Sequence, residues 1–209
     1  FAQFCGIVGQ VEEFTKKAMS GQMTFADALL KRIEILNMHD ETLLQDFLAY
    51  MSTRIELTTN FIPLLEQFRK DNKMIFFISG GFDYFIFPLL QQTLPSDLCV
   101  PEEHIFANRF IFAKDQPATV DMTRHTAQCG GKAKVINYLQ KKFNIDNFAI
   151  IGDGVTDLEA RPAAKFVLGY GGVAERDVVK KNANWFVTNY QDVIEVINNT
   201  NQSQSSELK

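Results

Sequence analysis

Two aspartates stand close together after an apolar run in the second half of the sequence. In "FAIIGDGVTDLEA" (148–160), Asp153 follows the run and Asp157 comes four residues later. Closely spaced carboxylates repel each other, and a bound cation offsets that repulsion most easily. Because the stretch offers oxygen donors and no histidine or cysteine, Mg²⁺ suits it better than zinc. The alternative is structural: Asp153 would be a helix N-cap, and Asp157 would favour a first helical turn electrostatically.

Two further stretches combine glycines with groups that suit a phosphate. In "FISGGF", Ser79, Gly80 and Gly81 follow an apolar run and open a predicted helix, so that a hydroxyl and backbone amides are available to a ligand. In "CGGKAK", Lys132 starts a second predicted helix, where its charge opposes the helix dipole unless an anion lies nearby. The alternatives are a plain strand-to-helix turn and a solvated surface lysine.

The elements that would position these stretches alternate between strand and helix from residue 58 to residue 198. Continuous apolar runs are typical of strands buried on both faces of a sheet. Helices of about ten residues between them, one of them from about Gly131 to Phe143, favour right-handed crossovers. We therefore predict an α/β fold with a doubly wound parallel sheet, whose strand ends gather the three stretches. The predicted strands are "MIFFIS" (74–79), "FAII" (148–151), "KFVLGY" (165–170) and "NWFVT" (184–188), with a short strand or hairpin in "HIFANRFIF" (104–112).

The flanking regions differ from this core. Residues 1–57 give helical spacing alone and predict a small helical domain that is incomplete at its start. Arg32 shares its apolar helix face with Phe25, a costly place for a cation unless it meets a carboxylate or extends to solvent. Residues 199–209 are polar and low in complexity, which predicts a disordered tail.

Composition excludes several classes of function. The net charge is −4, with 21 basic and 25 acidic residues interspersed, so no basic face suits a nucleic acid. The apolar runs are far shorter than the ~20 residues that cross a bilayer, so we expect no membrane partner. Three widely spaced cysteines predict free thiols and a cytoplasmic location. A homodimer is compatible with the sequence.

The order of the three stretches resembles the haloacid dehalogenase superfamily of phosphotransferases. Ser79-Gly80-Gly81, then Lys132, then Gly152-Asp153-Gly154 with Asp157, match its second, third and fourth motifs. Within the superfamily, the chain resembles the phosphoserine phosphatases of the serine pathway from about Phe4 to Glu195. The matching segments are "KKAMSGQMTFADALLKRIEIL", "FFISGGF", "FANRF", "CGGKAKVI", "IGDGVTDLEARP" and "GYGG".

This resemblance implies a Mg²⁺-dependent hydrolase that acts on O-phospho-L-serine beneath a helical cap. Ser79 and the two glycine amides would hold the phosphoryl oxygens, and Lys132 would neutralise the phosphate. Asp153 would ligate Mg²⁺, while Asp157 would orient Lys132 or a metal-bound water. Arg32 would meet the serine carboxylate. The other residues implied to enclose the substrate are Met19, Ser20, Gly21, Phe25, Thr156 and Arg176.

One motif of the superfamily does not occur in this sequence. The nucleophile and the general acid are two aspartates in a D-x-D-x-T/S motif on the first strand, and the 209 residues contain no D-x-D. We therefore expect this strand and its aspartates upstream of Phe1, and little or no activity from the chain alone. The alternatives are a phosphate-ligand binding protein without a nucleophile and a phosphatase for another small phosphomonoester. A dinucleotide oxidoreductase is disfavoured because "GDGVTD" lacks the third glycine of that fingerprint.

Overall fold

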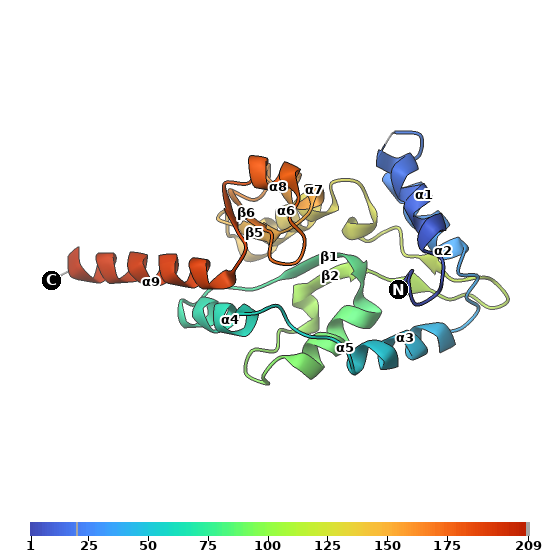
Figure 1. Ribbon diagram of the computed structural model, residues 1–209, viewed down its shortest axis with the longest axis horizontal. Helices are drawn as coiled ribbons and strands as arrows, with labels where there is room; N and C mark the ends of the chain where they lie inside the picture. The colour runs from blue at the N-terminus through green and yellow to red at the C-terminus, as the bar shows by residue number, and fades with distance from the viewer. Residues whose placement is uncertain (20, 208–209) are drawn as a thin grey trace. The chain divides into compact units, whose positions relative to one another are not determined.

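The structure is a computed structural model that describes residues 1–19 and 21–207 (Figure 1). The side chains of Met19 and 200–207 are not described. The chain divides into two units, each assembled from separate stretches of sequence. Unit 1 comprises Phe1–Ile55, Phe77–Gln92 and Pro101–Gly131, and unit 2 comprises Glu56–Phe76, Thr93–Val100 and Lys132–Lys209. Both units cut across the predicted cap (1–57) and core (58–198), which stay predictions.

Unit 1 packs helices and short strands around one apolar cluster. Its core side chains come mainly from α2, α3 and α5, and include Leu29, Leu44, Phe47 and Phe85. Thr24 caps α2 by accepting a hydrogen bond from the Asp27 amide at 3.0 Å, which fixes where that helix begins. The elements are α1 (Val8–Met19), α2 (Phe25–Glu34), α3 (Thr42–Ser52), β1 (Phe77–Phe82), α5 (Asp83–Thr93), η1 (Glu102–His104), β2 (Ile105–Asn108), β3 (Phe110–Ile111), β4 (Thr119–Val120) and η2 (His125–Ala127).

The strand β1 carries a bulge where it pairs with the parallel strand β2. Ile78 lies opposite Phe106 and Phe82 lies opposite Asn108, so β1 advances four residues where β2 advances two. Ser79, Gly80 and Gly81 lie between these two pairs, where β2 has Ala107 alone, and α5 begins only after them. This corrects the expectation that the two glycines open a helix. They lie inside the strand β1, in a bulge where the regular pairing with β2 is interrupted.

The predicted position of this strand is also corrected. The run "MIFFIS" (74–79) predicts a strand buried on both faces, whereas β1 starts at Phe77, its residues are half-buried or exposed, and Met74 is exposed. Apolar residues alone do not define where backbone pairing begins. Of the two alternatives for 104–112, the short strand forms as β2, whereas the hairpin does not, because β2 pairs with β1 and β3 pairs with β4.

Unit 2 contains a three-stranded parallel sheet in the order β5-β6-β7. The central strand is buried from Val167 to Tyr170, and Leu168 lies opposite both Ile151 of β5 and Trp185 of β7. Parallel strands joined by helices confirm the predicted α/β class. The predicted upstream strand stays a prediction. The elements are α4 (Phe61–Lys70), α6 (Gly131–Phe143), β5 (Ala149–Gly152), α7 (Val155–Leu158), β6 (Phe166–Tyr170), α8 (Asp177–Asn182), β7 (Trp185–Val187) and α9 (Tyr190–Glu207).

Three smaller findings bear on the sequence expectations. α9 continues to Glu207 through most of the predicted tail (199–209), because no glycine or proline interrupts it, while residues 208–209 lie outside the described residues. Cys5, Cys99 and Cys129 are free thiols. Within the described residues, every helix is too short or too polar to cross a membrane.

Candidate active site

The glycine-rich stretch of unit 1 lies in the β1 bulge. The Gly81 amide donates to the Ser79 hydroxyl oxygen (N···Oγ 3.0 Å), and the Gly80 carbonyl accepts from the Asn108 side chain (Nδ2···O 2.8 Å). A methyl group added at Gly80 would meet no described atom within 4 Å. Glycine at this position therefore leaves open space beside a hydroxyl and an amide, the groups that bind a phosphate.

Lys132 and Asp157 form a buried ion pair in unit 2. Lys132 is the second residue of α6, and its Nζ lies 2.5 Å from Oδ1 of Asp157 in α7. The Asp157 side chain is 3% exposed, and its Oδ2 accepts a hydrogen bond from the Gly154 amide at 3.1 Å. Both carboxylate oxygens thus have a partner, which allows a charge to be buried here. The structure brings together the two residues that the resemblance pairs.

Asp153 follows β5 and interacts with a cation of its own. The Arg176 guanidinium donates both to the Asp153 carboxylate and to its backbone carbonyl. The Asp153 side chain is 47% exposed and that of Arg176 48%. Arg176 directly precedes α8, so the short helix positions the cation over the end of β5. Sequence reasoning placed both residues near the site and missed their pairing.

Asp153 offers one carboxylate to a hard cation such as Mg²⁺. Among the described residues, no three histidine, cysteine, aspartate or glutamate side chains converge. Mg²⁺ nevertheless needs only one or two carboxylates when waters and substrate phosphate complete its shell. Asp153 fits as one oxygen ligand, whereas the Asp157 oxygens are already bonded to Lys132 and Gly154.

Arg32 of unit 1 is a half-buried cation. Its Nε donates to the Ala28 carbonyl one helical turn earlier (3.0 Å), and burial lowers the pKa of the guanidinium. Among the described residues, no carboxylate lies within ion-pair distance of it. Phe25 is half-buried at the start of the same helix. Arg32 therefore carries a charge that an anionic ligand could neutralise.

The other predicted residues are placed as follows. Gly21 has a φ of +74°, a left-handed conformation that favours glycine. Thr156 is exposed in α7, beside Asp157. Met19 ends α1, and Ser20 lies outside the described residues. Their roles toward a substrate stay predictions.

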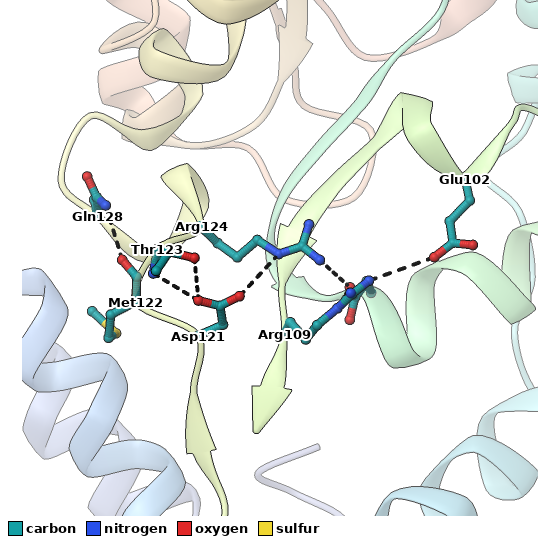
Figure 2. Close-up of polar contacts among 8 residues, drawn as sticks. Glu102, Arg109, Asp121, Met122, Thr123, Arg124 and Gln128 are labelled. Carbon is teal, nitrogen blue, oxygen red and sulfur yellow. Dashed lines mark hydrogen bonds and ion pairs between the residues drawn. The ribbon is translucent and has the colours of Figure 1, made fainter. Parts of the chain in front are cut away.

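Figure 2 shows a set of polar contacts in unit 1 that sequence reasoning missed. Arg109 donates from Nε to the Asp83 carboxylate at the start of α5 (2.7 Å), and Arg124 Nη2 lies 3.5 Å from the same oxygen. Arg124 also faces Asp121, whose pKa is lowered by hydrogen bonds from the Thr123 hydroxyl and amide. The signal was present in "FANRF", where polar residues directly follow a strand, but their partners lie too far away in the sequence to be inferred.

Known proteins resemble this chain over most of its length. No family model matches it. A phosphoserine phosphatase of Rattus norvegicus is 36% identical over 194 residues, covering 92% of this chain and 83% of that protein. One of Drosophila melanogaster is 32% identical over 195 residues, 92% of this chain and 69% of that protein. The crystal structure of a phosphoserine phosphohydrolase-like protein from Francisella tularensis aligns with a TM-score of 0.67 at 24% identity, covering 90% and 84% of the two chains.

The fold, the ion pair and these similarities define the class of the protein first. The chain is an enzyme with a parallel α/β fold and the Lys132–Asp157 pair in the first turns of α6 and α7. Its fold aligns with that of a haloacid dehalogenase family hydrolase of Salmonella enterica with a TM-score of 0.68 at 21% identity, covering 90% of this chain and 60% of that chain. Within that class, the chain belongs to the phosphoserine phosphatase family.

Proposed function

We propose that this protein hydrolyses O-phospho-L-serine to L-serine and phosphate, with Mg²⁺ as cofactor. The observation that carries the proposal is the buried Lys132–Asp157 ion pair, four residues from the exposed carboxylate of Asp153. A lysine fixed by a buried aspartate is a preorganised positive charge, which stabilises a transferring phosphoryl group without reorganising during the reaction. The names of the relatives supply the substrate, and the free thiols support a cytoplasmic location.

The remaining residues of the chain have separate tasks in this proposal. The Ser79 hydroxyl binds a phosphoryl oxygen from the β1 bulge, and the Gly81 amide, which donates to the Ser79 oxygen, holds that hydroxyl in place. Arg32 binds the substrate carboxylate, since it is half-buried and faces no carboxylate of the described chain. Arg176 approaches the substrate from the Asp153 side.

Asp153 would hold Mg²⁺ through its carboxylate. When bound, Mg²⁺ supplies charge neutralisation at the phosphoryl oxygens. Arg176 now donates to that carboxylate, so this chain's own cation must share Asp153 or leave it when the metal binds.

The nucleophile would come from outside the 209 residues, which contain no D-x-D. One aspartate would attack phosphorus to form an aspartyl-phosphate, and the second would protonate the serine oxygen and then activate water. Uncatalysed hydrolysis of phosphate monoesters is so slow that enzymes accelerate it up to ~10²¹-fold, which electrostatic stabilisation alone does not supply.

The test is phosphate release from O-phospho-L-serine with Mg²⁺, by this chain and by a form extended upstream through its coding sequence. We expect activity in the extended form only, and its loss in Lys132→Met but not in the exposed matched control Lys181→Met. Activity in the chain alone would place the nucleophile within the 209 residues. Inactivity of both forms would favour a binding protein or a different phosphomonoester.

A further inference from the structure

Asn108 is a fully buried polar residue without a role in the activity described above. It ends β2, its side chain is inaccessible to solvent, and its Nδ2 donates to the Gly80 carbonyl at 2.8 Å. Its Oδ1 is buried and has no hydrogen-bond partner among the described residues. An unpaired buried acceptor is destabilising. A residue that serves packing alone would not need an amide here.

The geometry of the bulge explains what the amide provides. Because β1 runs two residues longer than β2 between Ile78 and Phe82, the ordinary ladder is interrupted at Gly80. The Asn108 side chain takes the place of a strand backbone and satisfies the Gly80 carbonyl.

The Gly80 carbonyl and the Gly81 amide belong to one planar trans peptide group, so they point in opposite directions. Fixing the carbonyl on Asn108 therefore fixes the direction of the Gly81 N–H. That N–H points to the Ser79 hydroxyl oxygen, 3.0 Å away. The Asn108 hydrogen bond thus orients the Gly81 amide and, through it, the Ser79 hydroxyl that binds phosphate in the proposed function.

The residues that follow Asn108 hold the far end of the bulge. Arg109 Nε donates to the carboxylate of Asp83, the first residue after β1, at 2.7 Å. Phe110 stacks on Phe82 with ring centroids 3.8 Å apart. Strand pairing holds the bulge at Ile78 and at Phe82, and between them the Asn108 amide directly restrains the Gly80–Gly81 peptide.

We propose that Asn108 is a positioning residue: its side-chain amide sets the Gly80–Gly81 peptide so that the Gly81 amide holds the Ser79 oxygen and the Ser79 hydroxyl donates to a phosphoryl group. The inference rests on the proposed function of the Ser79 hydroxyl. It predicts that a side chain able to donate to the Gly80 carbonyl is required for tight phosphate binding, while burial at this position is not sufficient.

The test measures inorganic phosphate binding to the 209-residue chain by calorimetry, together with the ¹⁵N amide shifts of Gly80 and Gly81. We expect Asn108→Ala to weaken binding about tenfold and to shift both amides in the absence of phosphate. Asn108→Asp should bind weakly at neutral pH, because its carboxylate cannot donate, and should recover toward wild type as pH falls and the carboxyl gains a proton. The phosphate affinity of the variant is compared with that of wild type at each pH, so the ionisation of phosphate affects both equally.

Thr126→Val is the matched control, since Thr126 also buries an unpartnered polar atom in unit 1. It should leave phosphate affinity and both glycine shifts unchanged. No binding by the wild-type chain would overturn this inference, while phosphate release by the upstream-extended form tests the proposed function separately. Binding by wild type with equal affinity in Asn108→Ala, or an Asp variant that tracks the Ala variant at every pH, would overturn this inference alone.

Discussion

The two aspartates of "GDGVTD" differ more in their surroundings than their spacing suggests. The Asp157 side chain is 3% exposed and has both oxygens bonded, one to Lys132 and one to a backbone amide. The Asp153 side chain is 47% exposed and pairs with a guanidinium that is equally accessible. Four residues separate a carboxylate enclosed by protein from one open to exchange.

Because the two aspartates differ in exposure, breaking their ion pairs should have different effects on stability. Breaking a buried pair leaves an uncompensated charge, which destabilises proteins by about 3–5 kcal/mol, whereas exposed pairs contribute about 0–1 kcal/mol. Asp157 therefore serves to fix a cation in place. Asp153 can exchange its partner at a low cost in free energy, which the proposed role as a Mg²⁺ ligand requires.

The largest effect is expected from Asp157→Asn. The variant keeps an acceptor for the Gly154 amide but leaves Lys132 without its anion, so we expect a loss of about 3 kcal/mol in unfolding free energy, the low end because Lys132 is partly exposed. Urea unfolding followed by the fluorescence of Trp185, the single tryptophan, reports on unit 2. Asp146→Asn, an exposed change in the same unit, should stay within about 0.5 kcal/mol. Equal losses in both would contradict the comparison.

Gly152→Ala should disturb the same pair through the backbone. A methyl group at Gly152 would overlap the Asp157 carboxylate, so the carboxylate must move away from Lys132. We expect a loss of about 1–3 kcal/mol in the same unfolding assay. In the matched control Gly154→Ala, the new methyl lies at an ordinary 3.4 Å from Asp157 Oδ2, and stability should change far less. A larger loss of stability in Gly154→Ala than in Gly152→Ala would show that a methyl group at residue 152 does not displace the Asp157 carboxylate.

Asp153→Asn should change stability by at most about 1 kcal/mol, because its pair with Arg176 is exposed. Its effect should lie in Mg²⁺ binding, which calorimetry would show to be lost. Arg176→Ala removes the competing cation and should strengthen Mg²⁺ binding while leaving stability similarly unchanged. Unaltered Mg²⁺ binding in Asp153→Asn would remove Asp153 from the metal site.

The smallest effect is a titration. The pKa of Tyr190 is raised to about 12, first by burial, then by Tyr170 and by Asp153. Since the folded pKa exceeds the ordinary value of 10, the stabilisation is complete below about pH 10 and is lost between pH 10 and 12. Asp153→Asn removes the weakest of the three causes and should lower the pKa slightly, as measured by phenolate absorbance. Tyr190→Phe identifies the signal, and an unchanged pKa would show that the Asp153 charge does not reach this ring.

The sequence was most informative where local pattern and sheet topology agree. The helix predicted from about Gly131 to Phe143 coincides with α6, and the runs in 165–170 and 184–188 contain β6 and β7. Lys132 and Asp157 are 25 residues apart, yet the rule that ligand groups gather at strand ends placed them together.

The sequence was least informative about contacts that a backbone irregularity creates. An apolar run does not reveal a bulge, so the position of β1 and the environment of Ser79 were misjudged. The role of Asn108 follows from the structure alone, because only the bulge leaves the Gly80 carbonyl in need of a side-chain donor. The Arg176–Asp153 pair depends on the short turn before α8, for which the sequence carries no periodic signal.

The bulge in β1 also limits how the length of this strand can change during evolution. Its excess over β2 is an even number of residues, and side chains alternate along a strand with a period of two. Phe82 therefore stays in step with Ile78 and reaches its stacking partner Phe110. Loss of a single glycine would turn Phe82 to the opposite face, whereas loss of both would keep the packing and remove the loop. Insertions and deletions in this segment should accordingly survive in pairs.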